Sequence, residues 1–558
     1  MANLSQIKRE KMLRFLETLK EQHSDDESLI ALNQIEKELT SKKYGLVWEE
    51  HEEEVDVKMQ THIPVFTEDE SREIVGNPES EDYNFLLEGD NLHSLKLLEK
   101  THKGKIDVIY IDPPYNTKSK DFIYDDIKIG EDDGYRHSKW ISFMQKRLEI
   151  AKNLLSNEGC IFISIDDNEQ APLKLLCDDI FGEKCFVANI PWRKRTAKSD
   201  VPYGISQDCE SILCYAKEGF KAAVKGKERK YYETEDFPGR PWRFHDLTTQ
   251  RTIEERPNSN YTMINPKDGI QYPVNPLRCW AITKDTFQEY YDAKRVIFPG
   301  DYKFLKISKP VLRYWKEDDQ KKAGSDFGLV AASTYLQSEV VGMTQDGTKE
   351  ITAIFGKKQF NFPKPSMLIK YLVHIATVKN TNAMILDFFA GSGTTAQAVL
   401  ELNKEDKGNR KFILCTNNEN DICEKITFQR IKTIITGKRI DGTEYSEGIP
   451  ANLKYYRTDF VTKDSEDLYE DLLNHIIEMI QLEYGVKVDN KKYVIIMDDD
   501  EMDTFEENFE KYSDLKAVFL NQDVLLSTSQ EQLLAEVNTF IIPDCYFDFE
   551  LREAGELW

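Results

Sequence analysis

The apolar positions along the chain change their period several times, and each change predicts a different kind of element. In residues 1–45, leucine and isoleucine recur at the helical period in two runs that the polar stretch HSDDES separates. Residues 46–80 are charged and poorly periodic, which is typical of a linker. The first 80 residues are therefore predicted to form a helical arm followed by a linker.

From residue 81 onward, short apolar runs alternate with amphipathic runs. NFLL, IDVIYI and CIFISIDD predict strands, and the stretches after the first two predict helices. The alternation returns after residue 360, in PSMLIKYLVHIATV, AMILDFF, AQAVLELN and KFILC. Strands that alternate with helices predict a parallel, doubly wound α/β sheet, which binds ligands beyond the carboxyl ends of its strands. Asp112 and Asp166 both follow such ends.

The charge of the chain is unevenly distributed. The net charge is −25, but residues 191–360 carry 29 Lys and Arg against 23 Asp and Glu, with basic clusters in WRKRTAK and KAAVKGKERK. Residues 461–558 carry 7 Lys and Arg against 25 Asp and Glu, and they contain strand-like runs and one helical run. A polyanion should therefore bind the middle of the chain and avoid its end. The acidic end would suit a protein partner or a second copy of the chain in a homodimer.

These changes predict five regions. They are a helical N-terminal arm with its linker (1–80), the first half of the α/β core (81–217), a basic insertion (218–360), the second half of the core (361–460) and a small acidic α/β domain (461–558). Aromatic residues are scattered through the middle, and most are expected in the core: Trp192, Tyr203, Trp242, Phe244, Trp280 and Tyr302.

Several classes of protein are disfavoured by composition. No run approaches the roughly 18 apolar residues of a membrane span, and the N-terminus lacks the apolar core of a signal peptide, so we expect a cytoplasmic protein. The nine cysteines form no Cys-x-x-Cys pair and no Cys/His cluster with zinc-like spacing. We therefore expect reduced thiols and no metal.

The segment DPPYNT, directly after the strand-like IDVIYI, is the first candidate for chemistry. Two prolines cannot continue the hydrogen-bond ladder, so the chain must leave the sheet as a rigid loop. Tyr115 can stack on a flipped-out base, while Asp112 and a backbone carbonyl accept hydrogen bonds from its amino group. Two such acceptors would make the amine a nucleophile. Taken alone, the tetrapeptide is equally compatible with a stiff turn.

The second candidate is LDFFAGSGTT, in which Gly391 and Gly393 open a helix after a strand. Glycines there allow the backbone to approach a ligand at a positive helix end, although a helix start that needs small residues would look the same. The Gly-Lys-Ser/Thr of a phosphate-binding loop is missing. The next strand ends near Glu419, where an acid in such folds accepts hydrogen bonds from ribose hydroxyls. A ribose-bearing ligand without a long phosphate chain is expected.

Together, DPPYNT and LDFFAGSGTT resemble the β-class of S-adenosylmethionine-dependent DNA amino-methyltransferases, and most of all the modification subunits of type III restriction-modification systems. LLEGDNLHSLKLL and FPKPSMLIKYLV resemble the family segments near the adenine and the methionine end of the cofactor. CESILCYAK resembles the segment where the recognition region starts, but Cys209 and Glu210 stand where a His-Glu pair is common. The resemblance covers residues 80–460 and implies a Rossmann-like methyltransferase sheet, with a target-recognition domain as the basic insertion.

The resemblance also implies roles for particular residues. The catalytic residues would be Asp112, Pro113, Pro114 and Tyr115. S-adenosylmethionine would bind Asp90, Asn91, Lys364, Pro365, Asp387, Phe389, Ala390, Gly391, Ser392, Gly393, Thr394 and Glu419. The basic cluster WRKRTAK separately predicts phosphate contacts, in which double-stranded DNA would bind Arg193, Lys194, Arg195 and Lys198, although such a run is equally compatible with a solvated surface.

The resemblance leaves alternatives, which can be ranked by chemistry. A cytosine-C5 methyltransferase needs a cysteine nucleophile, usually after proline, and the chain has no Pro-Cys. Asp112 favours adenine N6 over cytosine N4, because N4 enzymes more often begin the tetrapeptide with serine. Relatives with Asn-Pro-Pro-Tyr act on RNA or protein glutamine but seldom carry a long basic insertion. A DNA-recognition or assembly subunit acting through a partner is the non-enzymatic alternative. A restriction partner would be a separate helicase-nuclease subunit, because the chain has no Walker A lysine motif.

Overall fold

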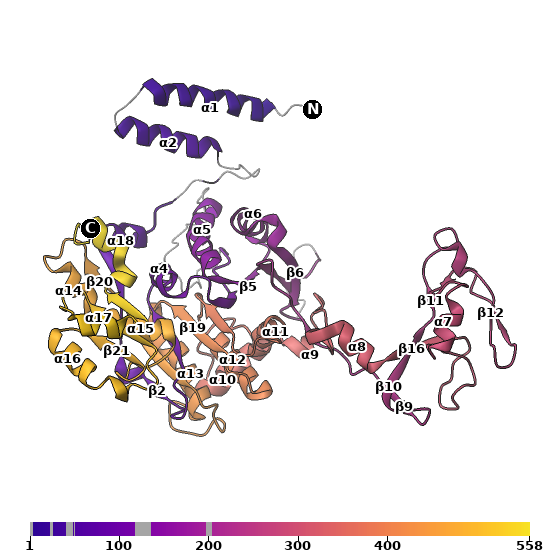
Figure 1. Ribbon diagram of the computed structural model, residues 1–558. Coiled ribbons are helices and arrows are strands. Elements are labelled where there is room, and N and C mark those ends of the chain that lie inside the picture. Colours follow the sequence, from indigo (N-terminus) through magenta and orange to yellow (C-terminus); the bar gives the residue numbers. More distant parts are fainter. Residues whose placement is uncertain are drawn as a thin grey trace. The chain divides into compact units, whose positions relative to one another are not determined.

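The computed structural model describes residues 4–22, 26–40, 48, 51–117, 136–196 and 204–557. The chain forms two compact units. The first unit consists of Met1–Lys221 and Ser333–Trp558, and the second consists of Ala222–Ala332. In Figure 1 the second unit carries the labels β9, β10, β16 and α7.

The first unit is built around a ten-stranded sheet, in the order β1-β20-β3-β19-β18-β4-β5-β7-β6 with β2 beside β20. The strands from β20 to β5 run parallel. At the two edges, β1 and β7 run antiparallel to them, and β6 runs antiparallel to β7. Their bounds are β1 (His62–Glu68), β2 (Ile74–Val75), β3 (Tyr83–Glu88), β4 (Ile106–Ile111), β5 (Leu155–Ile165), β6 (Phe186–Arg193), β7 (Cys209–Ala216), β18 (Met384–Asp387), β19 (Lys411–Thr416) and β20 (Asn452–Thr462).

The two halves of the core interleave in this sheet. Strands β18 and β19, from the second half, lie between β3 and β4 of the first half. Leu386 in β18 pairs with Ile109 in β4, so the two strands end at nearly the same level. Their carboxyl ends therefore place the loop after Ile111 next to the loop after Asp387, at the edge where such sheets bind ligands.

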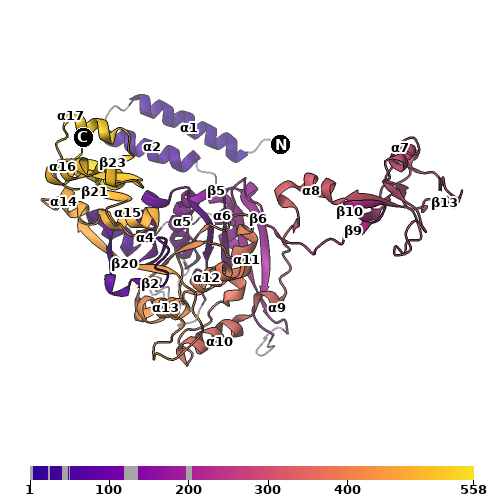
Figure 2. The same ribbon diagram turned by 60° about the horizontal axis from the view of Figure 1, so that its bottom comes forward.

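Helices cover both faces of the sheet. One layer contains α4 (Asn91–His102), α5 (Arg136–Leu154) and α6 (Gln170–Phe181), and the other contains α11 (Ser366–Thr377), α12 (Thr394–Asp406) and α13 (Phe428–Thr436). Helix α10 (Thr344–Phe355) packs against α13, and α9 (Ser338–Val341) packs against α11. Figures 1 and 2 show the two layers, with α10 and α13 coming forward in the second view. The predicted Rossmann-like, doubly wound α/β fold is confirmed.

The N-terminal residues contain the two expected helices, α1 (Leu4–Gln22) and α2 (Asp26–Thr40), which Lys20 and Glu36 join by an ion pair of 2.6 Å. The stretch that we predicted to be a linker contains α3 (Glu54–Thr61) and β1. Strand β1 buries Ile63, Val65 and Phe66 and pairs with β20 along seven residues. The linker prediction is therefore wrong for this part, because the partner strand lies almost 400 residues away in the sequence.

The acidic C-terminal residues form a three-stranded parallel sheet of β21 (Tyr493–Ile496), β22 (Ala517–Asn521) and β23 (Thr539–Ile542). Five helices accompany it: α14 (Leu468–Leu473), α15 (Ile476–Tyr484), α16 (Asp499–Glu507), α17 (Thr528–Leu534) and α18 (Asp544–Ala554). Side chains of α14, α15 and α18 are part of the main hydrophobic core, while α16 and α17 cover a smaller core of their own. Within the described ranges, no helix combines the length and the apolar character that crossing a membrane requires.

Most regular elements of the second unit are strands, and long irregular stretches connect them. Its main sheet has the order β15-β16-β10-β9, and three short pairs accompany it: β11 with β14, β12 with β13 and β8 with β17. The bounds are β8 (Val224–Lys225), β9 (Tyr232–Thr234), β10 (Phe237–Asp246), β11 (Thr248–Thr249), β12 (Met263–Ile264), β13 (Gln271–Tyr272), β14 (Cys279–Trp280), β15 (Val296–Ile297), β16 (Val311–Trp315), β17 (Leu329–Val330), α7 (Phe287–Asp292) and α8 (Lys316–Ala323).

The aromatic residues singled out in the sequence have different environments. Trp192 in the first unit and Trp242 and Trp280 in the second are buried, as expected for core residues. Phe244 is 40% exposed and Tyr302 is half-buried. Tyr203 lies outside the described residues.

Candidate active site

The loop after β4 is held rigidly on its inner side. The Trp140 indole, on α5, donates a hydrogen bond of 2.6 Å from Nε1 to the carbonyl of Pro114. Trp140 is fully buried, so this bond fixes the double proline against the core. Asp112 and Tyr115, on either side of the prolines, are left partly accessible. The rigid loop that the sequence predicts is therefore also anchored from behind.

A cavity of about 480 Å³ opens at the carboxyl ends of β4, β5 and β18. Both candidate motifs contribute to its wall, and so do residues from six other segments. The lining residues are Tyr110, Asp112, Pro113, Tyr115, Thr117, Asp166, Lys194, Arg195, Glu210, Thr344, Phe360, Asn361, Phe362, Pro363, Lys364, Ile369, Asp387, Phe389, Ala390, Gly391, Ser392, Thr394, Thr395 and Ile422. Its volume is in the range of small-molecule sites.

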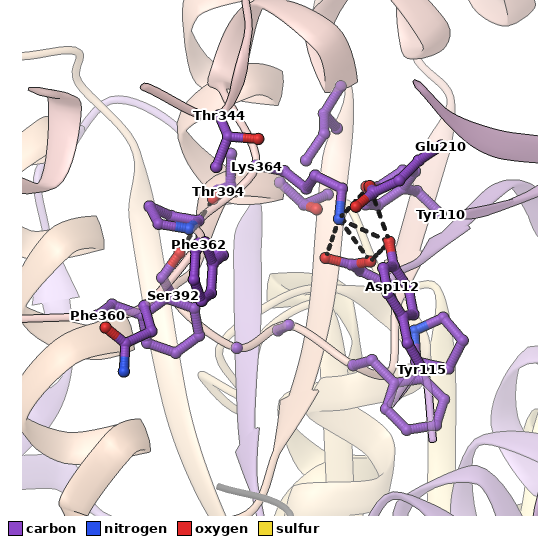
Figure 3. Close-up of a pocket in the computed structure, with 18 of the residues that line it drawn as sticks. Tyr110, Asp112, Tyr115, Glu210, Thr344, Phe360, Phe362, Lys364, Ser392 and Thr394 are labelled. Atoms are coloured by element: carbon purple, nitrogen blue, oxygen red, sulfur yellow. Dashed lines mark hydrogen bonds and ion pairs between the residues drawn. The ribbon is translucent and has the colours of Figure 1, made fainter. Parts of the chain in front are cut away.

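Four side chains meet on one wall of this cavity, as Figure 3 shows. Lys364 Nζ lies 2.8 Å from both oxygens of Asp112 and 2.8 Å from the Tyr115 hydroxyl oxygen. It is also 3.4 Å from Glu210 Oε2. The Tyr115 hydroxyl donates to Asp112 Oδ1 at 2.7 Å and lies 3.2 Å from Glu210. Lys194 Nζ contacts the other oxygen of Glu210 at 3.1 Å.

The sheet explains why Glu210 reaches this wall. Strand β7 runs antiparallel to β5, and Ser211 pairs with Ile165, the last residue of β5. The first residues of β7 therefore lie at the carboxyl end of β5, beside Asp166. Two carboxylates and two ammonium groups thus come together from four segments of the sequence.

These charges stabilise one another. Burial alone would lower the pKa of Lys364, but the charges of Asp112 and Glu210 raise it overall. Burial alone would raise the pKa of Glu210, but Lys364 and Lys194 lower it overall. Burial, with Asp112 and Glu210 nearby, raises the pKa of the Tyr115 hydroxyl far above its ordinary value. At neutral pH Tyr115 is therefore protonated, while Lys364 and Glu210 are held in their charged forms.

The glycine loop forms the opposite wall. Gly391 and Gly393 have φ angles of 49° and 74°, in the left-handed region that favours glycine. A side chain at Gly391 would stand 3.5 Å from the Phe360 ring, and one at Gly393 would come within 3.2 Å of Thr427. Gly393 is the N-cap residue of α12. The loop therefore presents bare backbone at the positive end of a helix.

Two buried charged residues hold this loop in place. Asp387 accepts hydrogen bonds from the Phe389 amide at 3.0 Å and from Thr395 Oγ1 at 2.5 Å, and burial raises its pKa to about 7. Arg430, on α13, donates to Thr394 Oγ1 at 2.8 Å and to Ser392 Oγ at 3.1 Å. Its second nitrogen pairs with Glu350 on α10 at 2.8 Å. The loop is thereby tied to α10 and α13.

The structure brings most of the predicted residues to this one cavity. Of the predicted catalytic residues, Asp112, Pro113 and Tyr115 line it. Of the predicted cofactor residues, Lys364, Asp387, Phe389, Ala390, Gly391, Ser392 and Thr394 line it, as do Lys194 and Arg195 of the predicted DNA contacts. Outside its lining are Pro114, Asp90, Asn91, Pro365, Gly393, Glu419 and Arg193. Lys198 lies outside the described residues.

Asp90 and Asn91 are engaged within the protein. Asp90 caps α4 by accepting a hydrogen bond of 2.7 Å from the Leu92 amide. Asn91 donates to the carbonyl of Phe388 at 2.8 Å, which joins the start of α4 to the chain just after β18. The fully buried Arg147 donates to Asn91 at 2.5 Å. These contacts join the two halves of the core directly below the glycine loop.

Sequence reasoning assigned no role to several residues of the site. Glu210 appeared only as the second member of a pair in which Cys209 stands where the family commonly has histidine. Phe362 is the first residue of the segment FPKP, and Phe360 lies two residues before it. Phe362 is 69% exposed and has a φ of 52°. Arg430 lies on an amphipathic helix of unremarkable composition. Only the two phenylalanines, beside a motif that was recognised, carried a signal that could have identified them.

Comparison with known proteins gives consistent matches. A model of the DNA methylase family (N6_N4_Mtase) matches residues 106–428, which is more than half of the chain. The chain is 35% identical over 394 residues to the type III restriction-modification enzyme StyLTI Mod subunit of Salmonella typhimurium, covering 63% of this chain and 56% of that protein. It is 30% identical over 387 residues to the type III restriction-modification enzyme EcoPI Mod subunit of Escherichia phage P1, and the match covers 60% of this chain and 58% of that protein.

A third relative is the type II methyltransferase M.KpnI of Klebsiella pneumoniae. It is 32% identical over 376 residues, covering 62% of this chain and 84% of that protein. The matches span less than two thirds of the length of either Mod subunit.

Proposed function

The chain belongs to the DNA methylase family, and from this premise we propose that it transfers a methyl group from S-adenosylmethionine to the N6 amino group of adenine in double-stranded DNA. The observation that carries the proposal is that Asp112 and Tyr115 line the same 480 Å³ cavity as the glycine loop. The cavity is therefore lined on one side by Asp112, which can accept hydrogen bonds from an amino group, and on the other by the exposed backbone of the glycine loop.

The residues of the cavity fit S-adenosylmethionine. Gly391 and Gly393 leave space that side chains would fill, and the N-terminus of α12 offers free amides. Asp387 lies beside the loop, and the strand after α12 ends near Glu419. When bound, the cofactor supplies a methyl group on a positively charged sulfur, which leaves readily as a neutral thioether. Asp387, Phe389, Ala390, Gly391, Ser392 and Thr394 would hold it.

The protein would activate and orient the amine. Asp112 and the carbonyl of Pro113 would accept both hydrogens of the amino group and so raise the electron density on its nitrogen. The ring of Tyr115 would stack on a base flipped out of the duplex. Asp112 would also take the proton that the amine loses. Because no covalent enzyme intermediate is needed, positioning would provide most of the catalysis.

DNA as the substrate is supported by the second unit. Residues 222–332 contain 20 Lys and Arg against 16 Asp and Glu. Phe244 and Phe304 are 40% and 49% exposed, and each ring stacks with Tyr232, at centroid distances of 6.3 and 4.9 Å. Lys230 Nζ lies 5.1 Å from the Tyr232 ring. Exposed stacked rings beside cations suit nucleic acid.

Adenine is proposed rather than cytosine because the tetrapeptide begins with Asp112. Within a restriction-modification system, the chain would be the cytoplasmic modification subunit, acting as a homodimer or with a helicase-nuclease partner. The names of the two Mod relatives support this role. An assembly subunit without catalysis is the alternative.

The proposal is tested by methyl transfer to DNA. The full chain is incubated with S-adenosylmethionine labelled on its methyl group and with unmodified duplex DNA, and the nucleosides are then separated. We expect label in N6-methyladenine. The variant Asp112→Ala should bind the cofactor with unchanged affinity and transfer no methyl group. Label in N4-methylcytosine would mean that cytosine, and not adenine, is the target base. A protein that neither binds the cofactor nor transfers a methyl group would favour the assembly role.

A further inference from the structure

The candidate catalytic carboxylate is already occupied by a cation. Lys364 Nζ is 2.8 Å from each oxygen of Asp112, and the Tyr115 hydroxyl donates to one of them. The lysine side chain is only 9% exposed, so water provides little screening of this ion pair. The sequence predicts that Lys364 contacts the cofactor, and this stays a prediction; within the protein, its ammonium contacts Asp112, Tyr115 and Glu210.

This arrangement conflicts with the chemistry proposed for Asp112, on which the present inference rests. An amino group of the target base must donate to the same oxygens that the ammonium occupies. The nitrogen also becomes more positive as it acquires the methyl group, and a fixed ammonium beside it would oppose that change. The ammonium must therefore have another place to bind during transfer.

Glu210 provides that place. Its side chain is 9% exposed, and its Oε2 is 3.4 Å from Lys364 Nζ, only slightly farther than the oxygens of Asp112. Its other oxygen is held by Lys194 at 3.1 Å, so the carboxylate stays oriented toward the cavity. A small movement of one flexible side chain would exchange one carboxylate for the other without leaving the buried ammonium unpaired.

We propose that Lys364 is a movable counter-ion that covers Asp112 before the base enters, and that Glu210 is the positioning residue that receives its ammonium when the amino group of the base binds Asp112. No bond is made or broken in this step. The ammonium of Lys364 moves from the oxygens of Asp112 to Glu210, and the amino group of the base then donates to the oxygens of Asp112. The site is thereby neutral both before and after the base is bound.

The test uses single-turnover methyl transfer by the full chain with saturating cofactor and DNA. Glu210→Gln keeps the shape of the side chain but removes its charge, so Lys364 should remain on Asp112. We expect the rate to fall about 30-fold, in line with the loss of one member of a buried charge pair, while the affinities for cofactor and DNA change by less than about threefold.

A second variant separates this role from a structural one. If the lysine is what blocks the site in Glu210→Gln, then removing it should restore transfer. The double variant with Lys364→Met and Glu210→Gln should therefore react about tenfold faster than Glu210→Gln alone. Lys370→Met, which removes a cation from the helix that follows Lys364, is the matched control and should react at the natural rate.

Two outcomes would overturn the proposal. One is a Glu210→Gln variant as fast as the natural protein, and the other is a double variant no faster than Glu210→Gln. Both presuppose a natural protein that methylates DNA. If the natural protein transfers no methyl group, the proposed function fails first, so the two failures can be told apart.

Discussion

At the scale of single residues, the charge of Asp387 is set by its surroundings. The side chain is 2% exposed, and burial raises its pKa to about 7. In an unfolded chain an aspartate titrates near pH 4. The folded protein therefore holds a proton between about pH 4 and pH 7 that the unfolded chain releases. The contribution of this carboxyl to stability is present below about pH 4 and is lost as the pH rises through 7.

This sign gives a prediction for Asp387→Asn, which cannot ionise. Its melting temperature, relative to that of the natural protein, should rise by about 2 °C between pH 5 and pH 8, because only the natural protein loses the contribution of this carboxyl over that interval. Thermal unfolding in a pH series measures the difference. Asp514→Asn, at an exposed position, should give a curve parallel to the natural one. If Asp387→Asn also runs parallel, burial does not keep the carboxyl protonated.

At the scale of elements, a glycine in α10 determines where Lys364 lies. A methyl group on Gly347 would come within 2.3 Å of the Pro363 carbonyl oxygen and 2.9 Å of the Lys364 carbonyl carbon. Both are backbone atoms that cannot turn away. The segment that carries Lys364 thus passes the helix at a distance that only glycine permits.

Gly347→Ala should therefore destabilise the protein, although alanine favours helices by about 1 kcal/mol over glycine. We expect a lower melting temperature and slower methyl transfer, because the backbone of Pro363 and Lys364 must move and the lysine then loses its position over Asp112. Thr352→Ala, at an exposed site of the same helix, is the control and should change neither property. Equal melting temperatures for the two variants would contradict the close approach.

The elements that could be predicted from sequence are those whose pattern is local. The strands β3, β4, β5, β18 and β19 and the helices between them follow from short-range periodicity, as do the proline corner and the glycine loop. Strand β1 could not be predicted, because its apolar residues lie in a charged stretch and its partner strand is far away in the sequence. The contact of Glu210 with Lys364 could not be predicted for a similar reason, since it depends on the antiparallel register of β7 with β5.

At the scale of the whole molecule, the two chain connections of the second unit are neighbouring strands. The chain enters it through β8 and leaves it through β17, and these two strands pair antiparallel, with Val224 opposite Val330 and Lys225 opposite Leu329. The Gly226 amide also donates to the Gly328 carbonyl at 2.8 Å. The entry and exit points therefore lie side by side, and a short turn can join them.

A chain in which a short glycine-rich turn replaces residues 227–327 should consequently fold. We expect its cofactor affinity to stay within about threefold of the natural value, while its affinity for duplex DNA falls by at least about tenfold and loses much of its dependence on salt. Calorimetry and fluorescence anisotropy measure the two affinities. If the shortened chain binds DNA as tightly as the natural one, the main DNA contacts belong to the first unit.

The paired entry and exit strands also have an evolutionary consequence. A segment bounded by two neighbouring strands can be exchanged by recombination as a cassette, because the flanking sequences need only preserve a hairpin. A descendant could acquire a new DNA target in one event and inherit the catalytic machinery untouched. Related chains should therefore differ most between these two strands.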